Sequence, residues 1–320
     1  MDFVYYKLPH SNEIQFVKGE FTILNEFDSK TSGFIVTDFL HRRKYILKED
    51  SNVKETMFHF KETKPYSISQ RDYLIEAQSA IHAFGLMGVE KMVYSRVKMI
   101  ELEHEKTHSI FENLSQAYPS AFCYLISSKH FGTWIGASPE VLTKKRGLQF
   151  NTVALASTKK NDDNSDWNSK DFDEHRFVVE SIKETAERYK IEELEIEGPY
   201  SHQAGPVRHL KTDFSGVFTK ENHWEFVNDL HPTPAVCGTP RIPALDLLLS
   251  REMHDRELYT GYIGVVDSLN LDLFVNLRCA QIQKGKAFLY VGGGFTKDSI
   301  AQNEWEETEN KAETLLKWMR

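Results

Sequence analysis

The stretch YIGVVDSLNLDLFVNLRCAQIQKGKAFLYV, residues Tyr262–Val291, indicates the fold class of this chain. It contains three runs rich in Val, Ile, Leu and Phe, at Tyr262–Val266, Leu273–Ile282 and Ala287–Val291, which are typical of β-strands. Only short polar segments separate these runs, so no helix fits between the strands. Strands that follow one another in this way favour antiparallel pairing over a doubly wound parallel sheet.

The rest of the chain has the same character. Further strand-like runs lie at residues 13–17, 21–24, 33–38, 44–47, 91–100, 120–127, 193–196 and 207–218. The predicted helices are one that is capped by Ser69 and ends by Gly88, a short one over 110–117, a long one capped by Ser169, one around 244–250 and a C-terminal one from about Trp305 to Met319. Strands outnumber helices, so we predict an α+β fold with large antiparallel β-sheets and helices packed outside.

Composition and charge limit the possible functions. The chain has 320 residues, with 39 Lys and Arg against 47 Asp and Glu, and a charge of −8 gives no broad basic field for nucleic acid. Apolar residues make up 40% and charged residues 27%, an ordinary balance for a globular protein. Three dispersed cysteines favour a reducing compartment, and no uninterrupted apolar stretch reaches the roughly 18 residues of a membrane span. We expect a cytoplasmic protein that binds neither nucleic acid nor membrane.

Acidic residues border two apolar helix faces. In the C-terminal helix Glu304, Glu307 and Lys311 are spaced three and four residues apart, which places them on one edge of the apolar stripe. Glu174 lies within the stripe of the long helix after Ser169, where a carboxylate needs a cation or a proton. For each residue alone, a solvated face or a salt bridge is the commoner role. Two carboxylates from separate helices also suit Mg²⁺, which takes one or two protein carboxylates plus substrate oxygens.

Arg278 and a glycine run are candidate anion-binding elements. Arg278 lies in a run that is apolar on both faces except for Asn276 and Arg278 itself. A buried guanidinium needs an anion, which can be a protein carboxylate or the carboxylate of a substrate. Gly292, Gly293 and Gly294 follow a predicted strand, and their backbone N–H groups could approach an anion closely, although most glycine runs are only turns.

The segment His104–His108 has the H-E-x-x-H spacing of zinc proteases. That motif functions within a helix, whereas here it lies between the strand that ends near Ile100 and the helix around Ile110. We therefore do not predict a zinc site.

Nine short segments form a recognisable set in one order along the chain. They are Lys91–Arg96 (KMVYSR), Gly136–Glu140 (GASPE), Ala154–Thr158 (ALAST), Glu174–His175, Leu230–Ala235 (LHPTPA), Arg256–Gly261 (RELYTG), Leu277–Ala280 (LRCA), Tyr290–Gly294 (YVGGG) and Glu304–Thr308 (EWEET) with Lys311. Together they resemble the chorismate-utilising enzymes, most closely the isochorismate synthases. The resemblance implies a chorismate-utilising catalytic domain at residues 66–320, with residues 1–65 as a strand-rich N-terminal segment of the same domain.

The resemblance also implies an activity and roles for residues. The expected reaction is a Mg²⁺-dependent, reversible isomerisation in which water adds at C2 of chorismate while hydroxide leaves C4. By similarity, Lys91 is the general base and Glu140 the general acid, and Glu174 and Glu307 bind Mg²⁺ directly, with Glu304 acting through water. The substrate-binding residues that the matched segments imply are Ala156, Ser157, Thr158, His231, Tyr259, Arg278, Gly292, Gly293, Gly294 and Lys311.

Two positions depart from the family pattern. Ser157 stands where the family has the glycine of Ala-Leu-Ala-Gly-Thr, and Cys237 replaces one glycine that follows Leu230–Ala235 in the family. We expect the Ser157 hydroxyl to lie near the substrate ring and to alter the hydrogen bonding there. Neither change removes a catalytic group.

Several alternatives remain open within this interpretation. Salicylate synthase shares the lysine base and continues by eliminating pyruvate from isochorismate. The ammonia-using anthranilate and aminodeoxychorismate synthases are less expected, because they lack the lysine that Lys91 matches and the latter carry a nucleophilic lysine where Ala156 stands. A chorismate-binding protein without activity is the alternative from another class.

We expect a monomer without an obligatory protein partner, and the product could serve menaquinone or siderophore biosynthesis, with menaquinone preferred. The polar segment 161–168 beside the long helix is a candidate lid.

Overall fold

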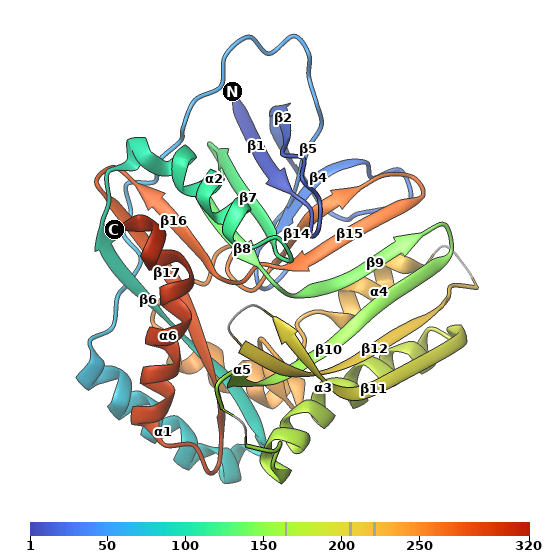
Figure 1. The fold of residues 1–320 in the computed structure, drawn as a ribbon, viewed down its shortest axis with the longest axis vertical. Helices are drawn as coiled ribbons and strands as arrows, with labels where there is room; N and C mark the ends of the chain where they lie inside the picture. The colour runs from blue at the N-terminus through green and yellow to red at the C-terminus, as the bar shows by residue number, and fades with distance from the viewer. Residues whose placement is uncertain (164, 205–206, 220–221) are drawn as a thin grey trace.

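The computed structural model describes the chain except residues 164, 205–206 and 220–221 (Figure 1). Its helices are α1 (Gln70–Met87), a 3-10 helix η1 (His104–Lys106), α2 (Thr107–Ala117), α3 (Ser169–Arg188), α4 (His223–Leu230), α5 (Arg241–Arg251) and α6 (Ala301–Met319). Its strands are β1 (Asp2–Lys7), β2 (Gln15–Gly19), β3 (Phe21–Leu24), β4 (Gly33–Thr37), β5 (Lys44–Leu47), β6 (Lys91–Glu101), β7 (Phe122–Ser128), β8 (Gly132–Ser138), β9 (Val141–Arg146), β10 (Gln149–Lys160), β11 (Glu192–Ala204), β12 (Val207–Val217), β13 (Gly238–Thr239), β14 (Tyr262–Val266), β15 (Asn270–Val275), β16 (Cys279–Gln283) and β17 (Lys286–Thr296).

The described strands form two large sheets. One has the order β13-β6-β17-β16-β8-β7-β1-β2, and the other has the order β11-β12-β10-β9-β15-β14-β4-β5-β3. Neighbouring strands pair antiparallel throughout both sheets. The α+β fold with large antiparallel sheets, predicted from the run of strands around Tyr262–Val291, is confirmed.

An aromatic core lies between the sheets, and helices cover their other faces. Phe122 of β7 and Phe274 of β15 stack across the core, with ring centroids 4.4 Å apart and planes at 3°. Successive residues of a strand point to opposite faces. Accordingly, Leu125 of β7 packs away from this core, in a cluster with Phe111 of α2 and Leu315 of α6. Helices α3 and α4 pack against the second sheet, and α1 and α5 pack beside β6 (Figure 1).

Helix ends follow the local signals in most cases. Ser69 caps α1 by accepting a hydrogen bond from the Asp72 N–H, and Gly88 ends the helix with φ 64°. For α3 the predicted cap was wrong by one residue. Asn168, not Ser169, is the N-cap, and it forms a reciprocal capping box with Asp171.

Other differences from the prediction concern connections. The run Leu273–Ile282 is not one strand, because the chain turns at Arg278 with φ 48° and resumes as β16. The glycines Gly292–Gly294 do not follow a strand but lie inside β17. Strand β1 and helix α4 were missed, since both are short and mix polar with apolar residues.

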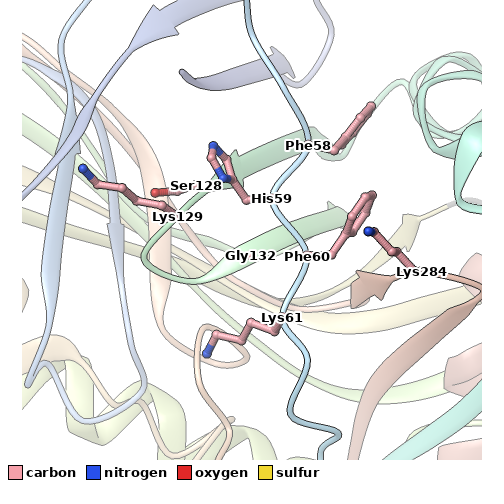
Figure 2. Close-up of a pocket in the computed structure, with 8 residues that line it drawn as sticks. All are labelled: Phe58, His59, Phe60, Lys61, Ser128, Lys129, Gly132 and Lys284. Carbon is pink, nitrogen blue, oxygen red and sulfur yellow. The ribbon is translucent and has the colours of Figure 1, made fainter.

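Residues 1–65 contribute strands to both sheets. Strand β1 pairs with β7 in the first sheet, and β4 pairs with β14 in the second. The chain then crosses the β7–β8 turn as an extended segment, beside a cavity of about 320 Å³ (Figure 2). Its lining residues are Phe58, His59, Phe60, Lys61, Ser128, Lys129, Gly132 and Lys284.

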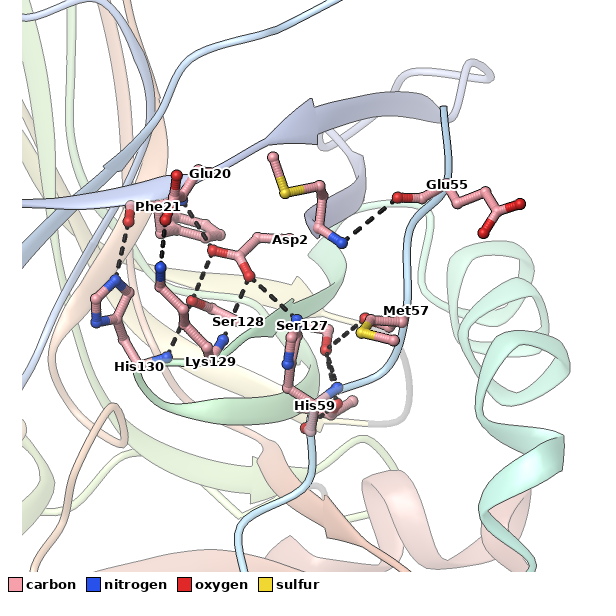
Figure 3. Close-up of polar contacts among 12 residues, drawn as sticks. Asp2, Glu20, Phe21, Glu55, Met57, His59, Ser127, Ser128, Lys129 and His130 are labelled. Atoms are coloured by element: carbon pink, nitrogen blue, oxygen red, sulfur yellow. Dashed lines mark hydrogen bonds and ion pairs between the residues drawn. The ribbon is translucent and has the colours of Figure 1, made fainter. Parts of the chain in front are cut away.

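Asp2 anchors this N-terminal part. Its buried carboxylate accepts hydrogen bonds from the Phe21 N–H at 2.9 Å, from the Ser128 hydroxyl at 3.0 Å and from the Lys129 N–H at 3.3 Å (Figure 3). The carboxylate thus joins the first strand to the β7–β8 turn. Among the described helices, none is long and apolar enough to span a membrane.

Candidate active site

A buried lysine and a helix carboxylate meet at one end of the first sheet. Lys91 begins β6, its side chain is 3% exposed, and its Nζ donates a hydrogen bond of 2.7 Å to Oε1 of Glu174 on α3. Burial alone would raise the pKa of Glu174. The charge and hydrogen bond of Lys91, with the charge of Lys311, outweigh burial and lower that pKa. Lys91 is buried on the strand face that was predicted, and it is paired there with Glu174.

Glu140 lies at the junction of β8 and β9. Its backbone is held in place by a hydrogen bond of 3.0 Å from the Val275 N–H to its carbonyl oxygen. Burial of the carboxyl group raises the pKa of Glu140 to about 7, although the charges of Lys91 and Lys311 act in the opposite direction. A carboxyl group with this pKa keeps its proton in a large part of the molecules at neutral pH, as a general acid requires.

The first turns of α6 bring two more carboxylates and a lysine to the same place. Glu304 is 6% exposed, and its Oε2 has no hydrogen-bond partner among the described residues. Burial raises the pKa of Glu304 to about 7, and the charge of Glu307 acts in the same direction. Lys311 Nζ contacts Oε1 of Glu307 at 2.5 Å and donates to the Gly292 carbonyl oxygen at 2.9 Å.

The glycines of β17 leave room for these groups. A Cβ at Gly293 would lie 3.1 Å from Oε2 of Glu304, and one at Gly294 would lie 3.1 Å from Cε of Lys91. The latter Cβ would also be 3.4 Å from Oε1 of Glu174. The described pairing of β17 with β16 ends at Tyr290, so beyond that residue β17 has a strand partner on the β6 side alone. Groups of α3 and α6 thus lie against Gly293 and Gly294, in the part of β17 that no longer pairs with β16.

Arg278 supplies a guanidinium group without a carboxylate partner. Its Nη1 donates to the Lys311 carbonyl oxygen at 3.0 Å and to the Thr314 hydroxyl at 3.3 Å. No carboxylate of the described residues lies within salt-bridge distance of it, so the structural salt bridge that the sequence left open does not form there. Burial lowers the pKa of the guanidinium, which indicates a group that would gain from an anionic ligand.

The second sheet contributes Ala156, Ser157 and Thr158 from β10. Ala156 is buried against the core of the second sheet. The hydroxyl of Ser157 points to α3 and not into open space, since it donates to the Asp171 carbonyl oxygen at 2.7 Å and lies 3.4 Å from Oε2 of Glu174. Thr158 Oγ1 lies 3.0 Å from Nδ1 of His209 on β12.

Sequence reasoning missed His209. Burial lowers the pKa of His209 to about 4, and the charges of Arg278 and Lys311 act in the same direction. The imidazole is therefore neutral at pH 7 and can hydrogen-bond to Thr158. Its place follows from the pairing of Thr158 with His209 across β10 and β12, which no local sequence signal indicates.

Tyr259 is positioned by a buried ion pair. Arg256 donates to Glu252 and to the Val236 carbonyl oxygen at 2.7 Å and 2.8 Å, and Glu252 also accepts from the Ser95 N–H at 2.6 Å. The turn held in this way brings the Tyr259 hydroxyl to within 3.0 Å of where a Cβ at Gly292 would be. Glu252 is a second residue that sequence reasoning did not identify.

His231 is buried beside His41 and the Tyr259–Thr260 turn. Its ring is 1% exposed and stacks on His41, with centroids 4.4 Å apart, and its Nε2 lies 2.6 Å from the Thr260 carbonyl oxygen. Burial lowers the pKa of His231, so the ring is neutral. The structure thus connects His231 to the site through the Tyr259–Thr260 turn.

Two other sequence features lie elsewhere. The H-E-x-x-H segment is divided between η1 and α2, so its histidines do not share one turn-to-turn helix face, and His104 and His108 pack on Phe60 and Tyr5. The cavity in Figure 2 contains none of the predicted site residues in its lining. Part of the candidate lid 161–168 falls on residue 164, outside the described residues. In the described part, Lys159 donates to the Asp166 carbonyl oxygen at 2.6 Å.

The carboxylates fit a hard divalent cation. Oε2 of Glu304 is buried without a hydrogen-bond partner among the described residues, and the charge of Glu307 raises the pKa of Glu304. Oε1 of Glu174 lies near Gly294, the neighbour of the Gly293 that Glu304 contacts. Within the described residues no three acidic, His or Cys side chains converge on one point. A cation here would therefore take one or two protein carboxylates and complete its shell with water or substrate oxygens, as Mg²⁺ does.

Comparison with known proteins identifies similar chains. The sequence profile described as chorismate binding enzyme matches residues 20–320. The vibriobactin-specific isochorismate synthase of Vibrio cholerae is 30% identical over 78% of this chain and 67% of its own length. Isochorismate synthase EntC of Escherichia coli is 31% identical over 71% of this chain and 62% of its own. The matched part thus spans about two thirds of the length of these relatives.

Solved structures show the same fold. The menaquinone-specific isochorismate synthase MenF of Escherichia coli superposes with a TM-score of 0.85 over 100% of this chain and 89% of its own, at 19% identity. Anthranilate synthase component I of Streptococcus pneumoniae superposes with a TM-score of 0.73 over 98% of this chain and 92% of its own, at 17% identity.

Proposed function

The chain belongs to the chorismate binding enzyme family, and on that premise we propose that it is an isochorismate synthase, an isomerase that converts chorismate to isochorismate. The observation that carries the proposal is that one site contains a candidate proton donor and a candidate proton acceptor. Glu140 has a pKa of about 7 and can donate a proton. Lys91 is buried, and it lies near enough for its charge to act on the pKa of Glu140. An exchange of hydroxyl groups between two ring carbons needs one such donor and one acceptor.

The reaction removes the hydroxyl group at C4 and adds a hydroxyl group from water at C2. A water oxygen bonds to C2 of chorismate, the ring double bonds shift, and the C4–O bond breaks. In the proposed mechanism Lys91 accepts the proton of the attacking water, and Glu140 protonates the departing hydroxide so that it leaves as water. Nζ of Lys91 donates to Glu174, and a neutral amine can keep this hydrogen bond while its lone pair accepts the proton of the water.

Chorismate carries two carboxylates, and the site offers three kinds of group to bind them. Arg278 presents a guanidinium that has no carboxylate partner among the described residues. Lys311 is within reach of the Gly292 carbonyl, so its ammonium lies beside the open edge of β17. The backbone of Gly292–Gly294 can approach a carboxylate without interference from side chains. The proposed substrate-binding set is completed by Ala156, Ser157, Thr158, His231 and Tyr259.

The metal completes this proposal. Glu174 and Glu307 would hold Mg²⁺ directly and Glu304 through a water molecule. The bound ion would neutralise the ring carboxylate of the substrate. In this structure the ammonium groups of Lys91 and Lys311 pair with Glu174 and Glu307, so this chain has an internal cation for each proposed ligand.

We propose that the enzyme works without an ammonia-supplying subunit, as a monomer in the cytoplasm. Ala156 occupies the position at which a nucleophilic lysine would direct the chemistry toward amination. Relatives named for menaquinone and for siderophore synthesis both occur, and we retain menaquinone as the proposed destination of the product.

The test is to incubate the purified protein with chorismate, with Mg²⁺ or with EDTA, and to separate the products by chromatography. We expect isochorismate at a reversible plateau with Mg²⁺ alone, and the same plateau when the reaction starts from isochorismate. Salicylate with pyruvate would contradict the proposal in favour of salicylate synthase. Chorismate that stabilises the protein but remains unconverted would indicate a binding protein.

A further inference from the structure

Ser157 has a backbone conformation that serine rarely adopts. Its φ is 56°, in the left-handed region, and it occupies a bulge of β10, where the register against β12 shifts between Ala156 and Thr158. Glycine takes this conformation without a steric penalty, whereas an L-residue with a Cβ is strained in it. Such strain persists only where the surrounding structure over-determines the conformation.

The Ser157 hydroxyl links this bulge to helix α3. The residue is 7% exposed, and its Oγ donates to the Asp171 carbonyl oxygen at 2.7 Å in the first turn of the helix. The same oxygen lies 3.4 Å from Oε2 of Glu174, one turn further along. Because a hydroxyl has one proton, the short bond to Asp171 is the stronger of the two contacts, and the oxygen limits where the Glu174 carboxylate can move.

Glu174 thus has a neighbouring group at each of its carboxylate oxygens. Lys91 contacts Oε1 at 2.7 Å, and Ser157 contacts Oε2 at 3.4 Å. The contact from Ser157 depends on β10 and α3 alone, so it persists when Lys91 moves away.

We propose that Ser157 is a positioning residue for the metal site: its hydrogen bond to the Asp171 carbonyl oxygen fixes the start of α3 against β10 and so sets the place of Glu174, one turn further along that helix, for binding Mg²⁺. The inference deepens the proposed function and rests on it, because it assigns Glu174 to the metal. A glycine at this position relieves backbone strain but supplies no hydroxyl. This chain thus has a strained residue in the bulge, and the hydroxyl of that residue supports the helix that carries one proposed metal ligand.

Two substitutions separate the hydroxyl from the backbone. Ser157→Ala removes the hydroxyl and keeps the strain, whereas Ser157→Gly removes both. We expect both variants to bind Mg²⁺ about tenfold more weakly in calorimetric titrations, since groups that support a metal ligand typically contribute roughly 10- to 100-fold in affinity. Ser157→Gly should nevertheless melt at a higher temperature than Ser157→Ala, because it alone relieves the strain.

The control is Ser169→Ala, which removes an exposed hydroxyl from the first position of the same helix and should leave Mg²⁺ affinity unchanged. Mg²⁺ affinity of Ser157→Gly equal to that of the unmodified protein, with a loss only in Ser157→Ala, would mean that backbone conformation matters and the hydroxyl does not, and would overturn the inference. Unmodified protein that binds no Mg²⁺ would overturn the metal site itself. Mg²⁺ binding that is unaffected by either substitution would overturn the role of Ser157 alone.

Discussion

The strand pair β6–β17 contains two halves that differ in what completes them. In the core half, residues 97–101 and 286–290, β17 is paired with β6 on one side and β16 on the other, and Phe288 and Tyr290 are buried between the sheets. The site half comprises residues 91–95 and 292–296 together with the charged groups of α3 and α6 that lie against them and Glu140, which interacts with Lys91; here the pairing with β16 has ended. Packed side chains fill the core half, whereas in the site half Oε2 of Glu304 has no hydrogen-bond partner among the described residues.

One strand pair thus serves both stability and chemistry. The core half is stabilised by apolar burial, which needs no ligand. The site half holds lysines and carboxylates in contact with one another, and burial of Lys91, whose side chain is 3% exposed, costs desolvation free energy. We therefore expect substitutions in the site half to affect activity more than stability, and substitutions in the core half to do the reverse.

The largest effect is expected from removing the acid or the base of the site half. Glu140→Gln keeps the shape of the side chain and the Lys91–Glu174 pair but cannot donate a proton, and Lys91→Ala removes the base. General acids and bases contribute roughly 10²- to 10⁴-fold, so we expect each variant to lose at least about 100-fold in turnover. Steady-state kinetics on chorismate would measure this.

The matched observation is stability. Glu140→Gln should melt at the same temperature as the unmodified protein or higher, since it removes a buried ionisable group. Near-normal turnover in either variant would contradict the assigned roles, and a large loss of stability in Glu140→Gln would break the separation between the two halves.

Phe288→Ala addresses the core half. Phe288 is 1% exposed within the aromatic cluster between the sheets. Truncation leaves a cavity, and such substitutions cost about 3–5 kcal/mol in the free energy of unfolding. Denaturant unfolding would measure the loss, and kcat of the folded variant at low temperature should remain within a few fold. A variant that unfolds normally but has lost its activity would contradict the comparison.

Arg278→Lys should have a smaller effect, on binding. Lysine keeps the charge but loses the planar fork that can bind a carboxylate with two parallel hydrogen bonds. Hydrogen bonds to charged groups contribute roughly 1.5–3 kcal/mol, so we expect KM for chorismate to rise about 10- to 100-fold with little change in kcat. If KM stays constant while the melting temperature falls, the guanidinium has only a structural role, through Lys311 and Thr314.

Most of the fold could be predicted because its signals are local. Ser69 and Gly88 mark the ends of α1 within a few residues, and the alternation from Lys91 onward marks β6. The cap of α3 was displaced because Asn168 and Ser169 can both cap a helix, and only the capping box with Asp171 decides between them. The break at Arg278 depends on a positive φ that no residue type at that position indicates.

The candidate site divides in the same way. The resemblance brought forward Lys91, Glu140 and the carboxylates of α3 and α6, and the structure brings these groups together. His209 and Glu252 were missed because their roles arise from pairing between distant segments: β12 with β10, and the turn at Arg256 with β6. The contact of the Ser157 hydroxyl with α3 was not predicted for a related reason, since it depends on the bulge in β10.

The smallest expected effect is on pH dependence, and it tests whether burial of the site half sets the chemistry. Burial raises the pKa of Glu140 to about 7, and an acid donates only while it is protonated. The protonated fraction is high below pH 7 and falls above it, so kcat/KM for chorismate should decline on the alkaline side, approaching about tenfold per pH unit. A profile of kcat/KM against pH at constant Mg²⁺ would measure this limb. In Glu140→Gln the residual activity should lack it, because glutamine does not titrate. A limb that persists unchanged in Glu140→Gln would have to come from another group, and the proton donor of the site half would then not be Glu140.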